Sequence, residues 1–300
     1  MRAASFIDPA AAGKHLIFVT DYQSSIGFID IYEEGGAQKM VGQIAGYLPA
    51  GLAVDTSRNL YVANSASVPI FAPPYTGAPT LTLSDPGYYA SGVAVSSRGL
   101  VGVANICGYP SCNLGTANVA FYAKDSTTPC AVVAGDPAQF TQILYDTFDS
   151  EGSLYVTAFD QSFNAVIGEV KGGCSAKTIK PLTTTNTLYY PFGIRVDRFD
   201  RIAILNKGGS TYDTLDVYNR PKGGSLGTPT AVVDLVTPAY PIDFAFSESD
   251  GKVYTAEQGS GGLSGTYAYP AGGTAEKSII VGGTPEDIAV SPPVVPHRKR

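Results

Sequence analysis

One short pattern recurs along the whole chain and constrains the fold more than any other feature of the sequence. Its clearest copy has a β-rich run at residues 51–55, ending in a turn-forming link, and a second β-rich run at residues 59–64. Looser or equally clear copies lie at residues 92–105, 143–158, 193–206 and 242–257. A third and a fourth run follow each pair, so that every copy supplies four antiparallel strands. Four such strands per repeat are the composition of a β-propeller blade.

The two ends of the chain complete one another. Residues 15–20 match the second run of the repeat without a first run before them, and residues 287–291 match the first run without a second run after them. First runs near positions 51, 92, 143, 193, 242 and 287 give six copies. Pairing of the end segments would close the ring and remove exposed sheet edges.

The sequence therefore predicts an all-β protein, a six-bladed β-propeller with four antiparallel strands per blade. We expect the propeller to span residues 14–291 and to be closed by one C-terminal strand plus three N-terminal strands. Residues 1–13 would form an N-terminal extension, and residues 292–300 a disordered tail.

Composition excludes several other classes of protein. Charged residues make up 15% of the chain, too few for a coiled coil or a charge-rich disordered protein. The 26 acidic residues outnumber the 20 basic ones, so we expect no nucleic-acid partner. No apolar run reaches the length of about 18 residues that a membrane-spanning helix needs, so we also expect no membrane span. We expect a monomer.

Four cysteines indicate an oxidising compartment. Cys107 and Cys112 flank a short turn-rich loop that a disulfide could close, and Cys130 would then pair with Cys174. Two other pairings and a structural zinc site are the alternatives. The disulfide interpretation predicts a secreted, periplasmic or cell-surface protein.

Polar side chains are expected to gather at one mouth of the central channel. In a propeller the first strand of each blade starts on the face where the second strand ends. This geometry brings together Asp21, Asn64, Asn105, Asn206, Glu257, Asp243, Glu286 and Asp287. Oxygen ligands from several blades could hold Ca²⁺, with Asp21, Glu257 and Glu286 as the expected ligands. The alternative is that these side chains only hydrogen-bond the nearby backbone at strand ends. By contrast, the carboxylates of Asp146 and Asp149 are expected to lie in a solvated turn.

Aromatic residues recur in the loops that lead into the first strands. The residues that we expect to bind a ligand on this face are Tyr47, Tyr89, Tyr190 and Tyr240, together with Asn64, Asn105, Asn206 and Lys207. Tyrosine combines an apolar ring face with a polar tip, which suits stacking on sugars or docking of a peptide surface. The alternative is that these rings, with Phe140 and Phe192, pack between the blades. Lys207 could hold an anionic ligand.

The segment at residues 51–64 resembles an NHL-type repeat of the six-bladed propellers in the gluconolactonase and senescence-marker class. The resemblance covers all six repeats as a pattern and implies a divalent metal at the channel mouth and lactonase activity. In that class an Asn in the turn before a first strand and an Asp at the end of a second strand bind the metal. Here the turns at 49–51, 90–92 and 191–193 lack the Asn, and the second strands end mostly in Asn, although Asp21 is acidic.

These observations favour a secreted binding or interaction module that uses its aromatic, loop-rich face. Its partner would be a small molecule, a glycan or a protein on that face. A Ca²⁺-dependent hydrolase or lactonase at the channel mouth is the alternative, and a scaffold without a small-molecule ligand is a third. Whether the protein is an enzyme stays open at this point.

Overall fold

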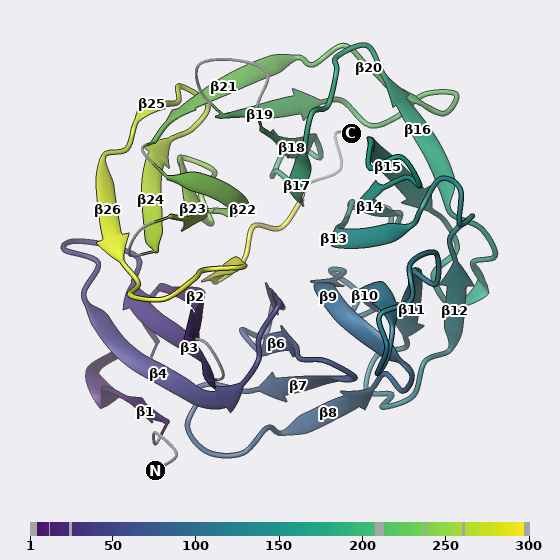
Figure 1. Cartoon of the computed structure of the whole chain (residues 1–300). Coiled ribbons are helices and arrows are strands. Elements are labelled where there is room, and N and C mark those ends of the chain that lie inside the picture. The colour runs from purple at the N-terminus through teal and green to yellow at the C-terminus, as the bar shows by residue number, and fades with distance from the viewer. Residues whose placement is uncertain are drawn as a thin grey trace.

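A computed structural model of the chain describes residues 5–11, 13–23, 26–207, 213–237, 239–259 and 262–296, and these form a six-bladed β-propeller (Figure 1). The blades are numbered here in chain order, with blade 1 combining the two ends of the chain. Two short 3₁₀ helices, Pro9–Ala11 and Gly173–Ser175, are the only helices among the described residues. The predicted fold class and blade number are confirmed.

Each blade runs outward from the channel through four antiparallel strands. Blade 1 contains β27 (Ile288–Ser291), β2 (Leu16–Gln23), β3 (Ile26–Glu33) and β4 (Met40–Tyr47); blade 2 contains β5 (Gly51–Val54), β6 (Leu60–Ala63), β7 (Ser67–Phe71) and β8 (Leu81–Ser84). Blade 3 contains β9 (Tyr88–Val95), β10 (Val101–Gly108), β11 (Asn118–Tyr122) and β12 (Ala131–Ala134); blade 4 contains β13 (Gln142–Phe148), β14 (Leu154–Phe159), β15 (Ala165–Val170) and β16 (Lys180–Thr184). Blade 5 contains β17 (Pro191–Val196), β18 (Ile202–Asn206), β19 (Asp213–Tyr218) and β21 (Ala231–Val236); blade 6 contains β22 (Tyr240–Phe246), β23 (Lys252–Gln258), β24 (Leu263–Ala268) and β26 (Lys277–Ile280).

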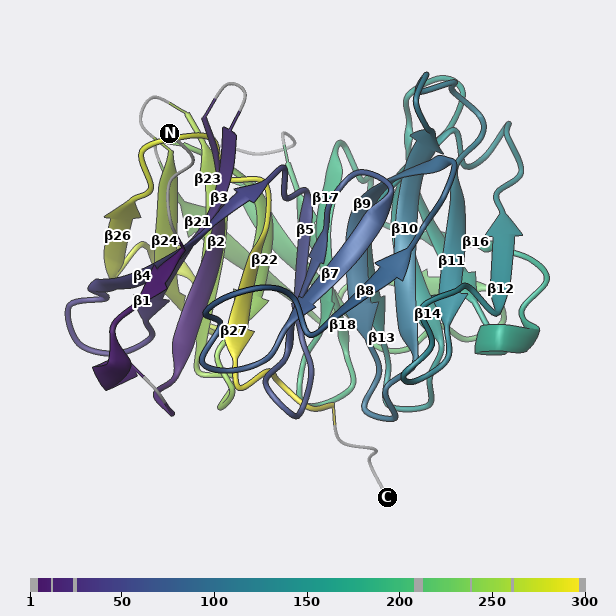
Figure 2. The same ribbon diagram turned by 90° about the horizontal axis from the view of Figure 1, so that it is seen from below.

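The ring closes through the two ends of the chain, as the repeat predicts. Strand β27 pairs with β2 in an antiparallel register that places Leu16 opposite Ser291 and Val19 opposite Ile288. Figure 2 shows the yellow β27 beside the purple β2. The C-terminal segment leaves β27 on the lower face in this view, whereas the second strands end on the upper face.

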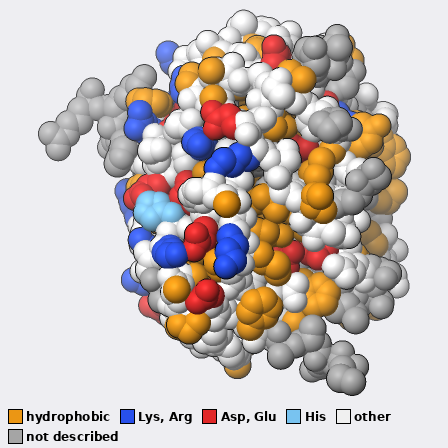
Figure 3. Space-filling view, turned by 90° about the vertical axis from the view of Figure 1, so that its left-hand side faces the viewer, with side chains coloured by type: hydrophobic (Ala, Val, Ile, Leu, Met, Phe, Trp, Pro, Cys, Tyr) orange, Lys and Arg blue, Asp and Glu red, His pale blue; other side chains and the backbone are white. Residues whose placement is uncertain are grey.

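Side chains reinforce this closure on the flank that blades 1 and 6 share. Here His15 of blade 1 lies 3.1 Å from Glu34 and 3.7 Å from Glu248 of blade 6, measured from its Nδ1 to a carboxylate oxygen. The Tyr254 hydroxyl of blade 6 donates to Glu34 as well. Figure 3 shows this flank, where basic and acidic side chains gather beside the histidine and hydrophobic side chains lie next to them.

The core is divided into six clusters, one between each pair of neighbouring blades. The alternation of side chains along a strand produces this division. In β6, for example, Leu60 and Val62 pack toward blade 1, while Tyr61 and Ala63 pack toward blade 3. Both faces of these strands are buried, which is why they read as continuous apolar runs.

On the lower face, the turn between the first and second strands has a repeated hydrogen-bond pattern. In blade 5 the Asp197 carboxylate accepts from the backbone N–H groups of Phe199 and Arg201, from the Arg201 guanidinium and from the Tyr269 hydroxyl. Asp55 and Asp149 close the corresponding turns of blades 2 and 4 through the same pair of backbone contacts. In these three blades the aspartate that ends the first run therefore holds the turn.

Three additional outer strands were not predicted. Phe6–Ile7 (β1) lies within the predicted N-terminal extension and pairs with β4, while Ser225–Gly227 (β20) and Gly273–Thr274 (β25) pair in parallel with β16 and β21 of the preceding blade. Each is only two or three residues long, too short to show a two-residue period in the sequence. Each adds a strand at the rim, and β20 and β25 also link neighbouring blades.

Both predicted disulfides are confirmed. Cys107–Cys112 closes a loop on the upper face of blade 3, and Cys130–Cys174 joins the segment before β12 to the 3₁₀ helix that follows β15. The second bond therefore connects blade 3 to blade 4. Two disulfides are compatible with an extracellular or periplasmic location. Among the described residues, no helix has the length and apolar character needed to cross a membrane.

Candidate functional site

The upper face carries the predicted site residues, and their roles differ. Strand pairing places Gly51 opposite Ala63 and Tyr240 opposite Gln258, so first strands start where second strands end. Asn64 and Asn206 use their side-chain oxygens to accept from the backbone N–H groups of Leu48 and Tyr189, at 2.7 and 3.0 Å. These contacts hold the loop that leads into the first strand of the same blade.

Asn105 has an equivalent structural environment. It is fully buried, and its side-chain nitrogen donates to the Asn118 side-chain oxygen at 3.0 Å. The strand-end hydrogen bonding that was the alternative interpretation thus accounts for Asn64 and Asn206, whereas the buried side-chain oxygen of Asn105 has no hydrogen-bond partner among the described residues. A direct role for them in ligand binding stays a prediction.

The three predicted calcium ligands have separate surroundings. Glu257 is buried and accepts hydrogen bonds from the hydroxyls of Thr237, Thr255 and Tyr267. Asp21 accepts from Gln23, and Glu286 from Gln258. In the described part of the chain, no three His, Cys, Asp or Glu side chains are placed to hold an ion. The calcium site therefore stays a prediction that this arrangement does not favour.

Some of the aromatic residues in the loops on this face pack as core residues. Phe140 is fully buried between blades 3 and 4. Tyr47 is half-buried, with its ring edge-to-face on Phe71 at 5.4 Å between centroids. Tyr89 is half-buried as well and stacks edge-to-face on Tyr109 at 4.8 Å.

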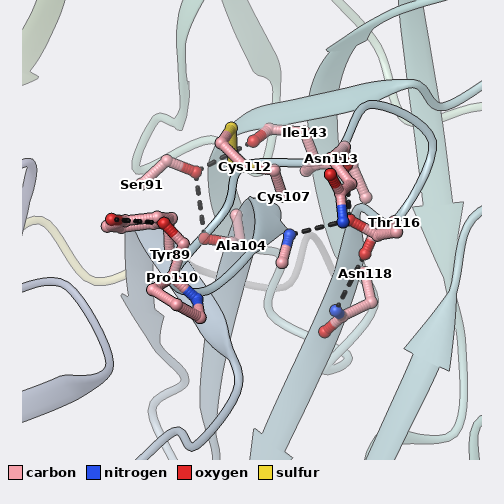
Figure 4. Close-up of a disulfide and its surroundings, with 11 residues drawn as sticks. Tyr89, Ser91, Ala104, Cys107, Pro110, Cys112, Asn113, Thr116, Asn118 and Ile143 are labelled. Carbon is pink, nitrogen blue, oxygen red and sulfur yellow. Dashed lines mark hydrogen bonds between the residues drawn. A yellow bond between two sulfur atoms is a disulfide. The ribbon is translucent and has the colours of Figure 1, made fainter.

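The disulfide loop of blade 3 lies beside Tyr89 and holds its side chain (Figure 4). The Tyr89 hydroxyl donates to the carbonyl oxygen of Pro110, which lies inside the loop closed by Cys107–Cys112. On the far side of the loop, the backbone N–H of Gly108 donates to the Thr116 hydroxyl at 2.7 Å. The disulfide thus fixes the position of an exposed aromatic residue, Tyr109.

A second group of aromatic rings extends across blades 4, 5 and 6, and is called here the aromatic cluster. Neighbouring rings lie 5.0 to 6.3 Å apart between centroids, from Phe163 to Phe159, from Phe159 to Tyr190 and from Tyr190 to Phe192. Tyr240 joins them through Lys207, whose ammonium lies 3.8 Å from the Tyr240 ring centroid and 5.8 Å from that of Phe192. The aromatic cluster consists of Phe159, Phe163, Tyr190, Phe192, Lys207 and Tyr240.

Exposure and burial alternate within the aromatic cluster. Phe163, Tyr190 and Tyr240 are 57%, 46% and 57% exposed. Phe159 is buried, and the partly buried Phe192 packs against three of the core clusters, those between blades 4 and 5, 5 and 6, and 6 and 1. The exposed rings are therefore anchored by buried ones, which limits the entropy they would lose on binding a ligand.

Below the upper mouth, the channel contains an ion-pair group that the sequence did not reveal. Arg195 of blade 5 forms ion pairs with Asp243 of blade 6 and, at 2.9 Å, with Asp287 of blade 1. Asp287 also accepts from the backbone N–H of Leu52 in blade 2. Arg195 thus connects blade 5 to two residues that lie 48 and 92 positions further along the chain.

Six side chains at one register position line the lower half of the channel. Each stands two positions before the residue that ends the first run of its blade. These side chains are Ala53, Ala94, Thr147, Arg195, Ala245 and Ala289. They surround a cavity of about 140 Å³, with residues 293–296 at its lower end. These four residues belong to the predicted tail 292–300, of which residues 297–300 lie outside the described residues.

The prediction of a solvated turn for Asp146 and Asp149 is wrong, because both side chains are buried. Asp146 is 2% exposed and takes the position that Leu52, Val93 and Ile194 occupy in other blades. Neither of its oxygens has a hydrogen-bond partner among the described residues. Burial raises the pKa of Asp146 well above its usual range, and the nearby Arg195 lowers it only in part.

Glu286 is the titratable group at the upper mouth. Burial raises the pKa of Glu286 to about 7, although the hydrogen bond from Gln258 opposes this and the Asp287 charge adds to it. A carboxyl group with that pKa exchanges a proton near neutral pH and can act as an acid or a base.

Comparison with known proteins supports the fold. No family model matches the chain, and no curated protein matches its sequence. A protein of unknown function from Bacteroides caccae is similar in structure, with a TM-score of 0.61 and 13% identity over 93% of this chain and 99% of that one. A protein from Bacteroides fragilis, provisionally assigned as a 6-phosphogluconolactonase, has a TM-score of 0.58 and 12% identity over 94% of this chain and 99% of its own. At this level of identity the similarity extends to the propeller fold alone.

Proposed function

We propose that the protein is a secreted binding module, of the NHL-like type that its repeat resembles, and that the aromatic cluster is its recognition surface. The observation that supports this most is the row of half-exposed rings across three blades, anchored on the buried Phe159 and on Phe192 above the channel. Exposed apolar side chains that are gathered in this way mark binding surfaces.

Carbohydrate is the ligand class that these rings suit best. A sugar presents an apolar C–H face that stacks on an aromatic ring and hydroxyls that hydrogen-bond a phenol group. Tyr190 and Tyr240 offer both, since about half of each side chain is open to solvent. The Tyr190 ring contacts Phe192, and the Lys207 ammonium lies near both Phe192 and Tyr240, so that two stacked sugar units would lie on either side of Phe192 and Lys207.

A glycan array with the purified protein, followed by calorimetry on the best-binding oligosaccharide, tests this proposal. Tyr190→Ala and Tyr240→Ala should each weaken binding about tenfold or more, because each removes one stacking face. Phe199→Ala is the matched control, since Phe199 is also an exposed ring but lies in the lower turn of blade 5. Equal affinity of all three variants and the unaltered protein would contradict the proposal.

Hydrolysis at the upper mouth is a second candidate function, supported by the pKa of Glu286 near 7. A carboxylate at this position could act as a general base toward a lactone or ester substrate. The test is hydrolysis of gluconolactone and related lactones, with Glu286→Gln as the variant. A rate that falls at least a hundredfold in Glu286→Gln would favour this function, and no hydrolysis above background would remove it.

A further inference from the structure

Lys207 occupies an unusual position for a lysine of this acidic protein. It follows β18, its backbone N–H donates to the Tyr190 carbonyl oxygen at 3.3 Å, and its side chain is half-buried. Its ammonium lies against the face of the Tyr240 ring and near that of Phe192. Cation–π contacts of this kind hold the charge at a fixed place on the upper face.

No carboxylate among the described residues lies within ion-pair distance of Lys207. Three described lysines, Lys14, Lys171 and Lys252, lie within 4 Å of a glutamate, and the others do not; Lys207 differs from them because its ammonium lies against the ring of Tyr240. The chain carries 26 acidic and 20 basic residues, so acidic partners are not scarce overall. The positive charge of Lys207 is therefore open to a negative group that a ligand brings.

Arg195, the nearest large cation deeper in the channel, cannot take this role. Its guanidinium is already bound to Asp243 and Asp287, and its side chain is only 16% exposed. Lys207 is thus the cation that adjoins the exposed rings of Tyr190 and Tyr240.

We propose that the ligand of the aromatic cluster is an acidic carbohydrate, whose carboxylate or sulfate pairs with Lys207 while its sugar rings stack on Tyr190 and Tyr240. This inference rests on the proposed function and adds the charge of the ligand to it. A charge-assisted hydrogen bond from an ammonium on a partly dehydrated surface is stronger than a neutral one. The aromatic rings would supply affinity for the sugar, and Lys207 the preference for the acid.

The experiment compares an oligogalacturonate hexamer with its fully methyl-esterified form, and a sulfated with an unsulfated chondroitin hexamer, by calorimetry. Each pair keeps the sugar rings and changes the charge. We expect the unaltered protein to bind the acidic member of at least one pair about tenfold more tightly, a difference that falls as salt rises. Lys207→Gln should lower the affinity for that acidic member to the neutral level and leave the neutral member unaffected.

Two controls separate this inference from the proposed function. Lys180→Gln removes a charge from an exposed lysine on the outer strand of blade 4 and should change neither affinity. Tyr190→Ala should lower the affinity for both members of a pair.

If Tyr190→Ala weakens binding but Lys207→Gln keeps the preference for the acidic member, the role assigned to Lys207 is wrong, whereas the aromatic cluster remains the binding surface. If no acidic carbohydrate binds, or if the neutral members bind equally well, the inference is overturned. Binding of a protein partner instead, unaffected by Lys207→Gln, would overturn it too.

Discussion

The two faces of this propeller use similar residue types for opposite purposes. On the lower face, Asp197 lies at the centre of a buried network with Arg201 and Tyr269. On the upper face, Asp160 makes the same pair of backbone contacts, to Ser162 and Asn164, but lies in an exposed loop. The lower turns recur because they hold blades together, whereas the upper loops differ from blade to blade and carry the exposed rings.

This difference separates the residues that stabilise the fold from the residues proposed to bind a ligand. Residues fixed by the repeat close the turns of the lower face and fill the core between blades. The rings of the aromatic cluster do not all share one repeat position: Tyr190 and Tyr240 each stand seven residues before the residue that ends the first run, whereas Phe163 follows a second strand. Variation on one face of a repeated scaffold is a usual arrangement for a binding surface.

The largest effect on stability is expected when the aspartate that holds a lower-face turn is removed, compared with the aspartate that makes the same backbone contacts in an upper-face loop. Asp197→Ala removes a fully buried carboxylate and leaves the half-buried Arg201 guanidinium and the buried Tyr269 hydroxyl without the acceptor that it provides, so we expect a loss of about 3 kcal/mol in the free energy of unfolding. Asp160→Ala, the upper-face control, should cost far less, since water replaces its contacts. Thermal and urea unfolding of both variants measures the difference. Similar losses in the two variants would show that the faces do not differ in this way.

Asp146→Leu tests a buried first-strand position at which the repeat has apolar residues in the other blades. Leucine has the same number of side-chain heavy atoms as aspartate and restores the aliphatic residue found at this register position in blades 2, 3 and 5. Because Asp146 is buried without a partner, we expect the variant to gain about 1 to 3 kcal/mol at pH 8.

The gain should depend on pH in a defined direction. The pKa of Asp146 is raised in the folded protein, so the folded state holds a proton that the unfolded state releases, and the unaltered protein loses stability as pH rises above the usual carboxyl pKa. The advantage of Asp146→Leu should therefore be larger at pH 8 than at pH 5. Asp146→Asn, which cannot titrate, should also lack the pH dependence. A Leu variant less stable than the unaltered protein at both pH values would refute this account of Asp146.

A further pH-dependent effect is expected at Glu286, near the upper mouth. Its pKa rises from 4.5 to about 7 on folding, so its contribution to stability is fully present below pH 4.5 and is lost as pH rises toward 7. The melting temperature of the unaltered protein minus that of Glu286→Gln should decrease between pH 4.5 and pH 7.5. A difference that stays constant over this interval would mean that Glu286 titrates normally.

The sequence predicts much of this fold because the repeat is local. Strand pairing within blades, the closure by residues 287–291 and the two disulfides follow from the order of short runs and turns along the chain. The short strands β1, β20 and β25 were missed because two or three residues have no readable period.

The site was harder to predict because it depends on contacts between distant blades. Arg195 stands out in the repeat, because the other blades have Ala or Thr at its position, but its partners Asp243 and Asp287 are far along the chain and could not be identified from the repeat. Burial of Asp146 could have been suspected, since it stands where the other copies have apolar residues. Which tyrosines are exposed depends on the neighbouring rings: Phe71 covers Tyr47, whereas Tyr240 contacts only the ammonium of Lys207 among the described ring and cation contacts.

Hydroxyl-radical footprinting with and without the oligosaccharide that binds best tests the central claim most directly, because it reports on both faces at once. Oxidation of Tyr190 and Tyr240 should fall several-fold on binding, while that of Phe199 on the lower face stays unchanged. Protection of Phe199, with Tyr190 and Tyr240 oxidised as before, would contradict the assignment of recognition to the aromatic cluster.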